Sequence, residues 1–133
     1  MLTGPLGAGK TCLAQGIARG LDVPGRLRSP TFVLMTRHQG RLVLNHLDLY
    51  RIDDPLEAWE LGMDEQLFGD GVSVVEWADK AQQLFPPDCC RAELEYCPDR
   101  SARNVTLTAA SARYEPVLQC LAAAFPSARE VTQ

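Results

Sequence analysis

A glycine-rich stretch near the start of the chain has the residue types and spacing needed to hold phosphate groups. Residues 4–11 read GPLGAGKT. Glycines permit a tight turn whose backbone N–H groups converge on an anion, and a helix that begins at the end of the loop adds its positive end. In such a loop Lys10 reaches the β- and γ-phosphates, and the Thr11 hydroxyl is a hard oxygen ligand for Mg²⁺. The pattern therefore predicts a nucleotide site.

Two carboxylates are candidates for the acid that such a site needs on another strand. Phosphoryl transfer requires a neutralising cation and a positioned water or hydroxyl nucleophile. Asp48 lies in HLDLYR and Glu76 lies in VVEW, and each closes an apolar, strand-like run. The run before Glu76 is the more continuously apolar, which is typical of a strand buried on both faces. Either acid could instead be a solvated strand end, so both remain candidates for the metal ligand.

The elements that must position these side chains can be predicted from hydrophobic spacing. Leu13, Ile17 and Leu21 recur at helical spacing and predict a helix from Lys10 to Gly20 under the phosphate loop. Other helices are expected over residues 54–62, 78–85 and 114–125, and strands over 32–37, 42–47, 72–76, 92–97 and 104–108. The pairs 32–37 with 42–47 and 92–97 with 104–108 are interpreted as antiparallel hairpins. The expected fold class is α/β, a P-loop NTPase-like sheet flanked by helices.

The start of the chain is short for such a fold. Only three residues precede the loop, whereas the strand that feeds a phosphate loop usually has about five or six. We therefore expect one P-loop domain over residues 1–133 whose N-terminal strand and helix are missing, with a disordered tail after about residue 126. Such a sheet is expected to keep an exposed apolar edge around Leu2 and Val74.

Composition narrows the functional classes. The chain has 133 residues, 46% of them hydrophobic, and a formal net charge of −4. A negative balance argues against broad binding to nucleic acid or anionic membrane. The sequence contains no apolar run of about 20 residues and no export leader, so a cytoplasmic location is expected. The odd number of cysteines without CxxC spacing favours reduced thiols over a zinc site.

Several motifs in order resemble one family. GPLGAGKT, SPTF, HLDLYR, residues 60–62 followed by Asp64-Glu65, and VVEW together resemble the TsaE (YjeE) family, the bacterial ATPase subunit of the tRNA threonylcarbamoyladenosine machinery. The resemblance spans residues 1 to about 108. It implies an ATP- and Mg²⁺-binding subunit that joins the TsaD and TsaB subunits and hydrolyses ATP slowly to sustain multiple turnovers of the transferase, TsaD. Contact with tRNA would be indirect, and no membrane is involved.

The resemblance also implies roles for individual residues. Thr11 and Glu76 would hold Mg²⁺, and Asp48 would be an essential acid near the γ-phosphate. The phosphates would be bound by Gly7, Ala8, Gly9, Lys10, Thr11 and Cys12. Lys10 and Thr31 would also serve catalysis, Thr31 on a switch-like loop that senses the γ-phosphate. Trp77 would pack beside the site, and Arg100 would contact the nucleotide. Cys12 stands where the family usually has a second threonine, which removes a hydroxyl but leaves the backbone role.

Two other functional classes share these residues. A small-molecule P-loop kinase would have the same loop, but it should also show an arginine-rich lid and an acceptor pocket, and neither is legible in the sequence. A nucleotide-gated interaction subunit without significant turnover would bind ATP through the same groups as a slow ATPase. Phosphate release measured with and without partner subunits separates these alternatives.

Overall fold

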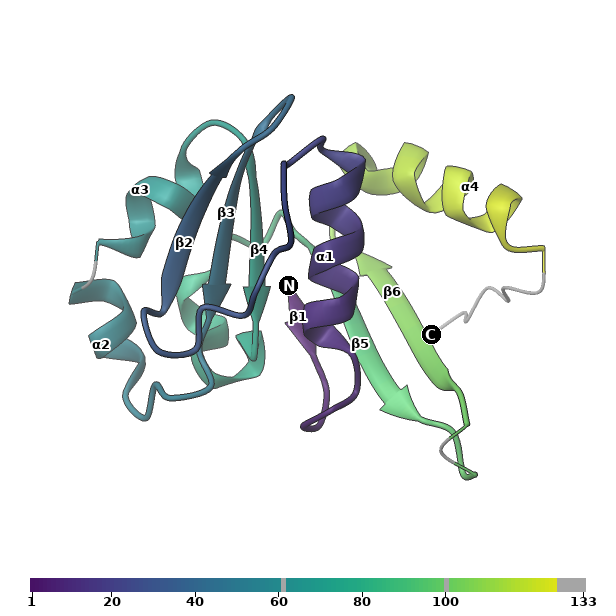
Figure 1. The fold of residues 1–133 in the computed structure, drawn as a ribbon, viewed down its shortest axis with the longest axis horizontal. Coiled ribbons are helices and arrows are strands. Elements are labelled where there is room, and N and C mark those ends of the chain that lie inside the picture. The colour runs from purple at the N-terminus through teal and green to yellow at the C-terminus, as the bar shows by residue number, and fades with distance from the viewer. Residues whose placement is uncertain (61, 100, 127–133) are drawn as a thin grey trace.

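The computed structural model describes residues 1–60, 62–99 and 101–126 (Figure 1). Its elements are β1 (Leu2–Thr3), α1 (Lys10–Gly20), β2 (Met35–Gln39), β3 (Val43–Asp48), α2 (Pro55–Glu60), α3 (Met63–Phe68), β4 (Val72–Glu76), the 3₁₀ helix η1 (Ala78–Leu84), β5 (Cys90–Tyr96), β6 (Arg103–Ala109), the 3₁₀ helix η2 (Ala112–Tyr114) and α4 (Glu115–Ala124). The predicted α/β class is confirmed. The expected tail and Arg100 lie outside the described residues.

The strands form one six-stranded sheet in the order β2-β3-β4-β1-β5-β6. The four inner strands, β3, β4, β1 and β5, are parallel to one another, and the edge strands β2 and β6 pair antiparallel with β3 and β5. Both predicted hairpins are thereby confirmed, and each lies at one end of the sheet. Because β1 occupies a central position, the loop that follows it emerges beside the carboxyl ends of its parallel neighbours, where α/β sheets bind ligands.

The expected exposed apolar edge around Leu2 and Val74 is wrong. Both side chains are 4% exposed. Leu2 lies between Glu76 of β4 and Ala92 of β5, and β4 is itself covered by β3 on its other side. The β5–β6 hairpin supplies the missing neighbour: the Ala92 N–H donates to the carbonyl of Met1 at 2.8 Å. Leu2 and Thr3 thus form a short central strand between two longer ones.

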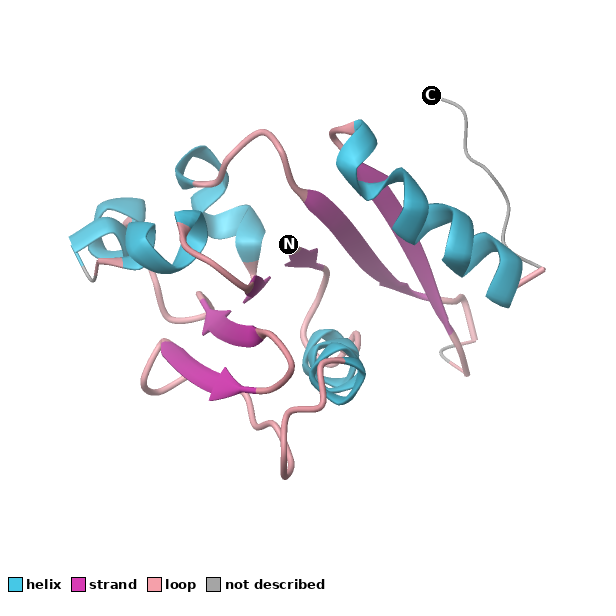
Figure 2. Ribbon diagram, turned by 90° about the horizontal axis from the view of Figure 1, so that it is seen from above, coloured by secondary structure: helices cyan, strands magenta, loops and turns pink. Residues whose placement is uncertain are grey.

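Helices cover both faces of the sheet (Figure 2). On one face, α1 packs over a core that contains Leu44 and Val74. The other face carries α2, α3 and η1 over a second core that contains Leu47 and Val75. The alternation of Val74 and Val75 between the two cores follows from the period of two in a strand. No helix among the described residues is long and apolar enough to cross a membrane.

The tip of the β2–β3 hairpin touches the far end of α1. The Arg41 N–H donates to the carbonyl of Leu21 at 2.8 Å, and the Arg41 Nε donates to the carbonyl of Gly20 at 3.1 Å. A Cβ added to Gly40 would lie 2.1 Å from the Leu21 oxygen. Only glycine fits this approach without movement of the backbone.

Three local elements differ from the sequence-based expectation. Strand β2 begins at Met35 because residues 30–34 form a turn in which the Pro30 carbonyl accepts the Leu34 N–H at 2.7 Å. The helix expected over 78–85 is a 3₁₀ helix with non-helical angles at Ala81. Helix α3 was not predicted; it begins after Gly62, whose left-handed φ of 68° separates it from α2.

Candidate functional site

The phosphate loop lies tightly against strand β5. Gly4, Gly7 and Gly9 have φ values of 129°, 75° and 107°, which favour glycine. A Cβ on Gly4 would lie 2.1 Å from the Leu94 carbonyl oxygen, and a Cβ on Gly7 would lie 2.8 Å from the Tyr96 hydroxyl. The Tyr96 hydroxyl donates to the Leu6 carbonyl at 2.6 Å. The close contact with β5 therefore favours glycine at positions 4 and 7, and the left-handed backbone favours it at all three positions.

Helix α1 begins directly at the end of this loop. Its N-cap residue, Gly9, offers no side chain to cap the helix, and the first turn carries no acidic residue. The positive end of the helix dipole therefore lies beside the loop without a carboxylate of the first turn to offset it. This combination is the one that favours an anion at a helix N-terminus.

The Lys10 side chain is held inside the loop. It is 4% exposed, and its ammonium donates to the carbonyls of Gly4 at 2.6 Å and Pro5 at 2.8 Å. The same nitrogen lies 3.6 Å from the centroid of the Trp77 ring, a cation–π contact. Burial lowers the pKa of Lys10 from its ordinary value, while nearby carboxylates, Glu76 foremost, raise it. Trp77 has a left-handed φ of 58°, so the backbone directly after Glu76 is strained.

Asp48 and Glu76 stand side by side at the carboxyl ends of two parallel strands. They are register partners in the β3–β4 pair, and each is 2% exposed. The Thr11 hydroxyl donates to Glu76 Oε2 at 2.8 Å. His46 contacts the other oxygen, with its Nε2 2.8 Å from Glu76 Oε1. Glu76 therefore links the first turn of α1 to strand β3.

Asp48 organises the turn that carries the SPTF segment. Its Oδ2 accepts hydrogen bonds from the hydroxyls of Ser29 and of Thr31, the latter at 2.5 Å. Its Oδ1 accepts the Tyr50 N–H at 2.9 Å. The Ser29 and Thr31 hydroxyls are also 2.8 Å apart. A short polar network thus fixes Thr31 next to Asp48, while Phe32 of the same segment is 86% exposed.

These groups surround one cavity of about 370 Å³. It is lined by Leu6, Gly7, Gly9, Lys10, Thr11, Ser29, Thr31, Asp48, Tyr50, Glu76 and Trp77. Most of the predicted site residues are therefore brought together. Ala8 is buried in the adjacent core and the Cys12 side chain is exposed, so neither side chain lines the cavity. The roles of all these residues stay predictions.

Sequence reasoning missed four contributors to this region. Ser29 and Tyr50 line the cavity, and the Tyr50 and Trp77 rings contact each other with centroids 5.0 Å apart. Ser29 could have been found as the second hydroxyl of the SPTF segment. The contact of His46 with Glu76 depends on strand register, and that of Tyr96 with the loop depends on sheet order, neither of which is legible in one sequence.

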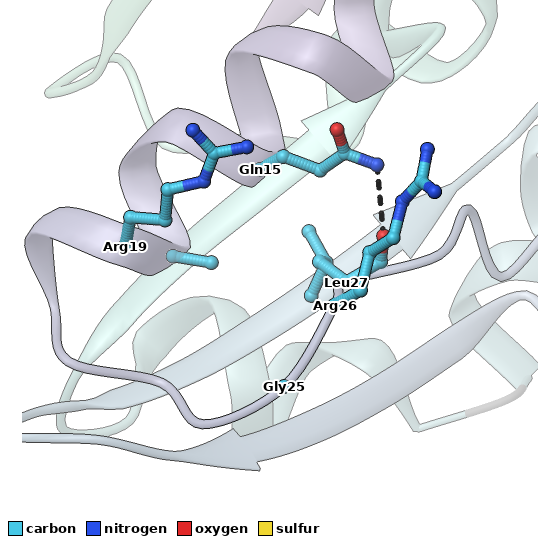
Figure 3. A pocket seen from close by; sticks show the side chains of 6 residues that line it. Gln15, Arg19, Gly25, Arg26 and Leu27 are labelled. Atoms are coloured by element: carbon cyan, nitrogen blue, oxygen red, sulfur yellow. Dashed lines mark hydrogen bonds between the residues drawn. The ribbon is translucent and has the colours of Figure 1, made fainter.

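A second cavity, of about 240 Å³, lies between α1 and the loop that leads to Ser29 (Figure 3). Gln15 of α1 donates from Nε2 to the Leu27 carbonyl at 2.9 Å, and Leu27 is 4% exposed. Arg19 and Arg26 border the same cavity. Its lining shares no residue with the first cavity. We interpret the Gln15–Leu27 contact as the anchor that holds the loop before Ser29 onto α1.

A mixed sheet whose short central strand runs through a GxxxxGKT loop into a helix, with buried acids at the ends of the parallel strands β3 and β4, defines the class of α/β proteins with a P-loop NTPase-like sheet. A sequence profile described as "Threonylcarbamoyl adenosine biosynthesis protein TsaE" matches residues 1–105. The chain belongs to the TsaE family.

Individual relatives agree with this assignment. The chain is 39% identical over 115 residues to a Bacillus subtilis (strain 168) protein described as tRNA threonylcarbamoyladenosine biosynthesis protein TsaE, covering 86% of this chain and 71% of the relative. A Treponema pallidum protein of the same description is 40% identical over 86 residues, covering 65% and 64%. A solved structure described as Bacillus subtilus YdiB superposes with a TM-score of 0.74 at 35% identity, covering 92% of this chain and 75% of that one.

Proposed function

We propose that this protein is the Mg²⁺-dependent ATP-binding subunit of the system that makes threonylcarbamoyladenosine in tRNA, and that it hydrolyses ATP slowly. The description of its family and relatives supports the pathway. The partners proposed from the family resemblance are the TsaD and TsaB subunits, with tRNA engaged only through them. In this proposal hydrolysis sustains multiple turnovers of the transferase subunit. We expect the protein to act in the cytoplasm.

The loop, α1 and Lys10 fit a nucleotide's phosphates. A cavity of about 370 Å³ falls within the range of small-molecule sites. The carbonyl oxygens of Gly4 and Pro5 accept hydrogen bonds from the ammonium of Lys10, which lines this cavity, and phosphate oxygens can replace them as acceptors. Tyr50 and Trp77 offer aromatic surface on the same rim.

Thr11 and Glu76 fit a hard divalent cation. Because the Thr11 hydroxyl donates a hydrogen bond to Glu76 Oε2, the lone pairs of its oxygen remain for a metal ion. Bound Mg²⁺ would supply neutralisation of the phosphate charge. This contact is the observation that carries the proposal, since it connects the phosphate loop to a buried acid on another strand.

Asp48 fits the role of the acid near the γ-phosphate. Three hydrogen bonds from Ser29, Thr31 and Tyr50 hold its carboxylate on the cavity wall. A change at Asp48 is therefore expected to move Thr31 as well. We propose that Thr31 reports the state of the γ-phosphate to the exposed Phe32 beside it through this network.

The metal assignment is tested with Glu76→Gln, which conserves shape and removes the charge. We expect Mg²⁺-dependent phosphate release to be lost while the melting temperature stays close to that of the parent. Glu57→Gln on α2, an exposed acid, is the matched control and should retain full activity. Activity that persists in Glu76→Gln at ordinary Mg²⁺ would make Asp48 the better metal ligand.

Partner dependence separates the proposed function from its rivals. Steady-state phosphate release is compared for the isolated protein, for the protein with TsaD and TsaB, and for that mixture with Thr31→Ala. We expect slow release alone, stimulation by partners, and loss of stimulation in Thr31→Ala. Stabilisation of transition-state charge by a group supplied in trans contributes about 10³ to 10⁵ in rate in other P-loop systems. A fast isolated enzyme indifferent to partners would favour a small-molecule kinase, and ATP binding without turnover in any mixture would favour a nucleotide-gated subunit.

A further inference from the structure

His46 is an enclosed polar residue next to the proposed metal site. It lies in β3, its side chain is 0% exposed, and it stands opposite Val74 of β4 in the register. Because side chains alternate along a strand, His46 and Glu76 point from the same face of the sheet. A carboxylate only accepts hydrogen bonds, so the 2.8 Å contact has His46 Nε2 as donor to Glu76 Oε1.

The two oxygens of Glu76 are divided between two partners. Oε1 accepts from His46 and Oε2 accepts from Thr11, each at 2.8 Å. Rotation of the carboxylate out of this arrangement breaks at least one of the two hydrogen bonds. The donor from β3 therefore determines the direction in which Oε2 points, and with it the direction of the Thr11 hydroxyl.

Packing alone does not account for a histidine at this position. The residues two positions before it and opposite it, Leu44 and Val74, are buried apolar side chains. The second ring nitrogen, Nδ1, is enclosed and has no hydrogen-bond partner among the described residues. An enclosed nitrogen without a partner costs free energy, which an apolar side chain of similar size would avoid. The polar contact that offsets this cost is the one to Glu76.

We propose that His46 is a positioning residue for the metal: its Nε2–H group holds Glu76 so that Glu76 Oε2 and the Thr11 oxygen face the cation together. This inference rests on the proposed function, because it assumes that Thr11 and Glu76 bind Mg²⁺. Residues that hydrogen-bond to a metal ligand without touching the metal typically contribute 10- to 100-fold to metal affinity. His46 is expected to act on the metal and to leave the direct binding of phosphates to the loop unchanged.

The test measures the metal's contribution to nucleotide binding apart from turnover. Calorimetric titration gives the Kd of ATP in EDTA and in Mg²⁺, and their ratio is the metal contribution. The variants are His46→Gln, whose amide reaches the position of Nε2, His46→Asn, whose amide is one carbon shorter, and His46→Leu. We expect the ratio to fall about tenfold in His46→Asn and His46→Leu, with the EDTA value unchanged, and to be largely restored in His46→Gln.

Matched controls separate the possible failures. His38→Leu replaces a half-buried histidine on the same hairpin, and it should leave the ratio at the parental value. Each variant is compared only if its thermal melt is cooperative; if His46→Leu does not fold, the comparison of Gln with Asn decides. A parental ratio in folded His46→Asn or His46→Leu overturns the inference, provided that Glu76→Gln lowers it. If Glu76→Gln also leaves the ratio unchanged, the proposed function itself fails at the metal site.

Discussion

The two regions of the molecule differ in how far their side chains are buried. The site half consists of strands β2, β3 and β4 with the phosphate loop and α1, and the C-terminal hairpin consists of β5 and β6. Five of the six residues of β3 are buried, whereas β6 and α4 contain no buried residue. Strands covered by helices on both faces read as continuous apolar runs, while an edge hairpin alternates. Strand β5 follows that alternation, with Ala92 and Leu94 directed into the core. Asp48 and Glu76 therefore lie in the more deeply buried of the two regions, where packing restricts the movement of their side chains.

The largest expected contrast between the two regions concerns nucleotide binding. Lys10→Ala removes the cation of the loop. If the ammonium donates two hydrogen bonds to the phosphates, each contributes about 1.5 to 3 kcal/mol, and their loss should weaken ATP binding at least about a hundredfold. Arg113→Ala removes a 74% exposed cation near α4 and should leave the Kd unchanged. Calorimetric titration of both variants checks this. An unchanged Kd for Lys10→Ala would remove the loop from the proposed site.

Packing predicts the next largest contrast. Leu44→Ala truncates a fully enclosed side chain and should lower the free energy of unfolding by about 2 to 5 kcal/mol. Val105→Ala truncates a side chain on β6 that is 48% exposed and should cost only about 0.5 kcal/mol. Urea denaturation of both variants measures the two values. Equal costs would mean that the hairpin is packed as tightly as the site half.

Two glycine-to-alanine substitutions within the site half should change the free energy of unfolding in opposite directions. Gly16→Ala in α1 should raise the free energy of unfolding by about 1 kcal/mol, because glycine is a poor helix former and an added Cβ meets no atom within 4 Å. Gly4→Ala should lower it, because the new Cβ would lie 2.1 Å from the Leu94 oxygen. Thermal melts report both. Stabilisation by Gly4→Ala would contradict the close contact between loop and β5.

The smallest predicted effect is a pH dependence at the edge of the site half. Burial, with a smaller electrostatic contribution from His46, lowers the pKa of His38 below its ordinary value of 6.5. The unfolded chain then binds more protons than the folded one just below pH 6.5, so the free energy of unfolding should rise as pH increases through this range. His38→Gln should flatten that slope in denaturation curves measured between about pH 5 and 7. If the free energy of unfolding depends on pH equally in His38→Gln and in the parent, His38 is not the source of this pH dependence.

Local patterns predicted much of the fold. The bounds of α1 agree with the expected Lys10 to Gly20, since helical spacing and a terminal glycine mark both ends. The start of α2 also follows from sequence: Asp54 Oδ1 accepts the Leu56 N–H at 3.0 Å, as an N-cap does. The buried run of β4 and its terminal Glu76 were equally legible.

Tertiary contacts explain what the sequence could not show. Phe32 and Val33 have high strand propensity, yet they lie in a turn because Asp48 holds Ser29 and Thr31 and the Pro30 carbonyl accepts the Leu34 N–H. The central position of β1 was invisible because its partners lie far along the chain. Among the candidate residues, the motif placed Lys10 and Thr11, whereas the contact of Thr11 with Glu76 depends on how α1 packs against β4, which no local pattern shows.

The contact between the hairpin tip and α1 has a mechanical consequence for the site. Helix α1 extends from Lys10 to the Leu21 carbonyl that Arg41 contacts, and β3 returns from that tip to Asp48. The tip contact therefore joins helix α1 and strand β3 at one end, and Lys10 and Asp48 lie at the other end. Because a side chain at position 40 would collide with the Leu21 carbonyl, glycine at this position permits the contact that ties the hairpin tip to the end of α1. A residue outside the cavity thus contributes to holding the two elements that carry Lys10 and Asp48 together.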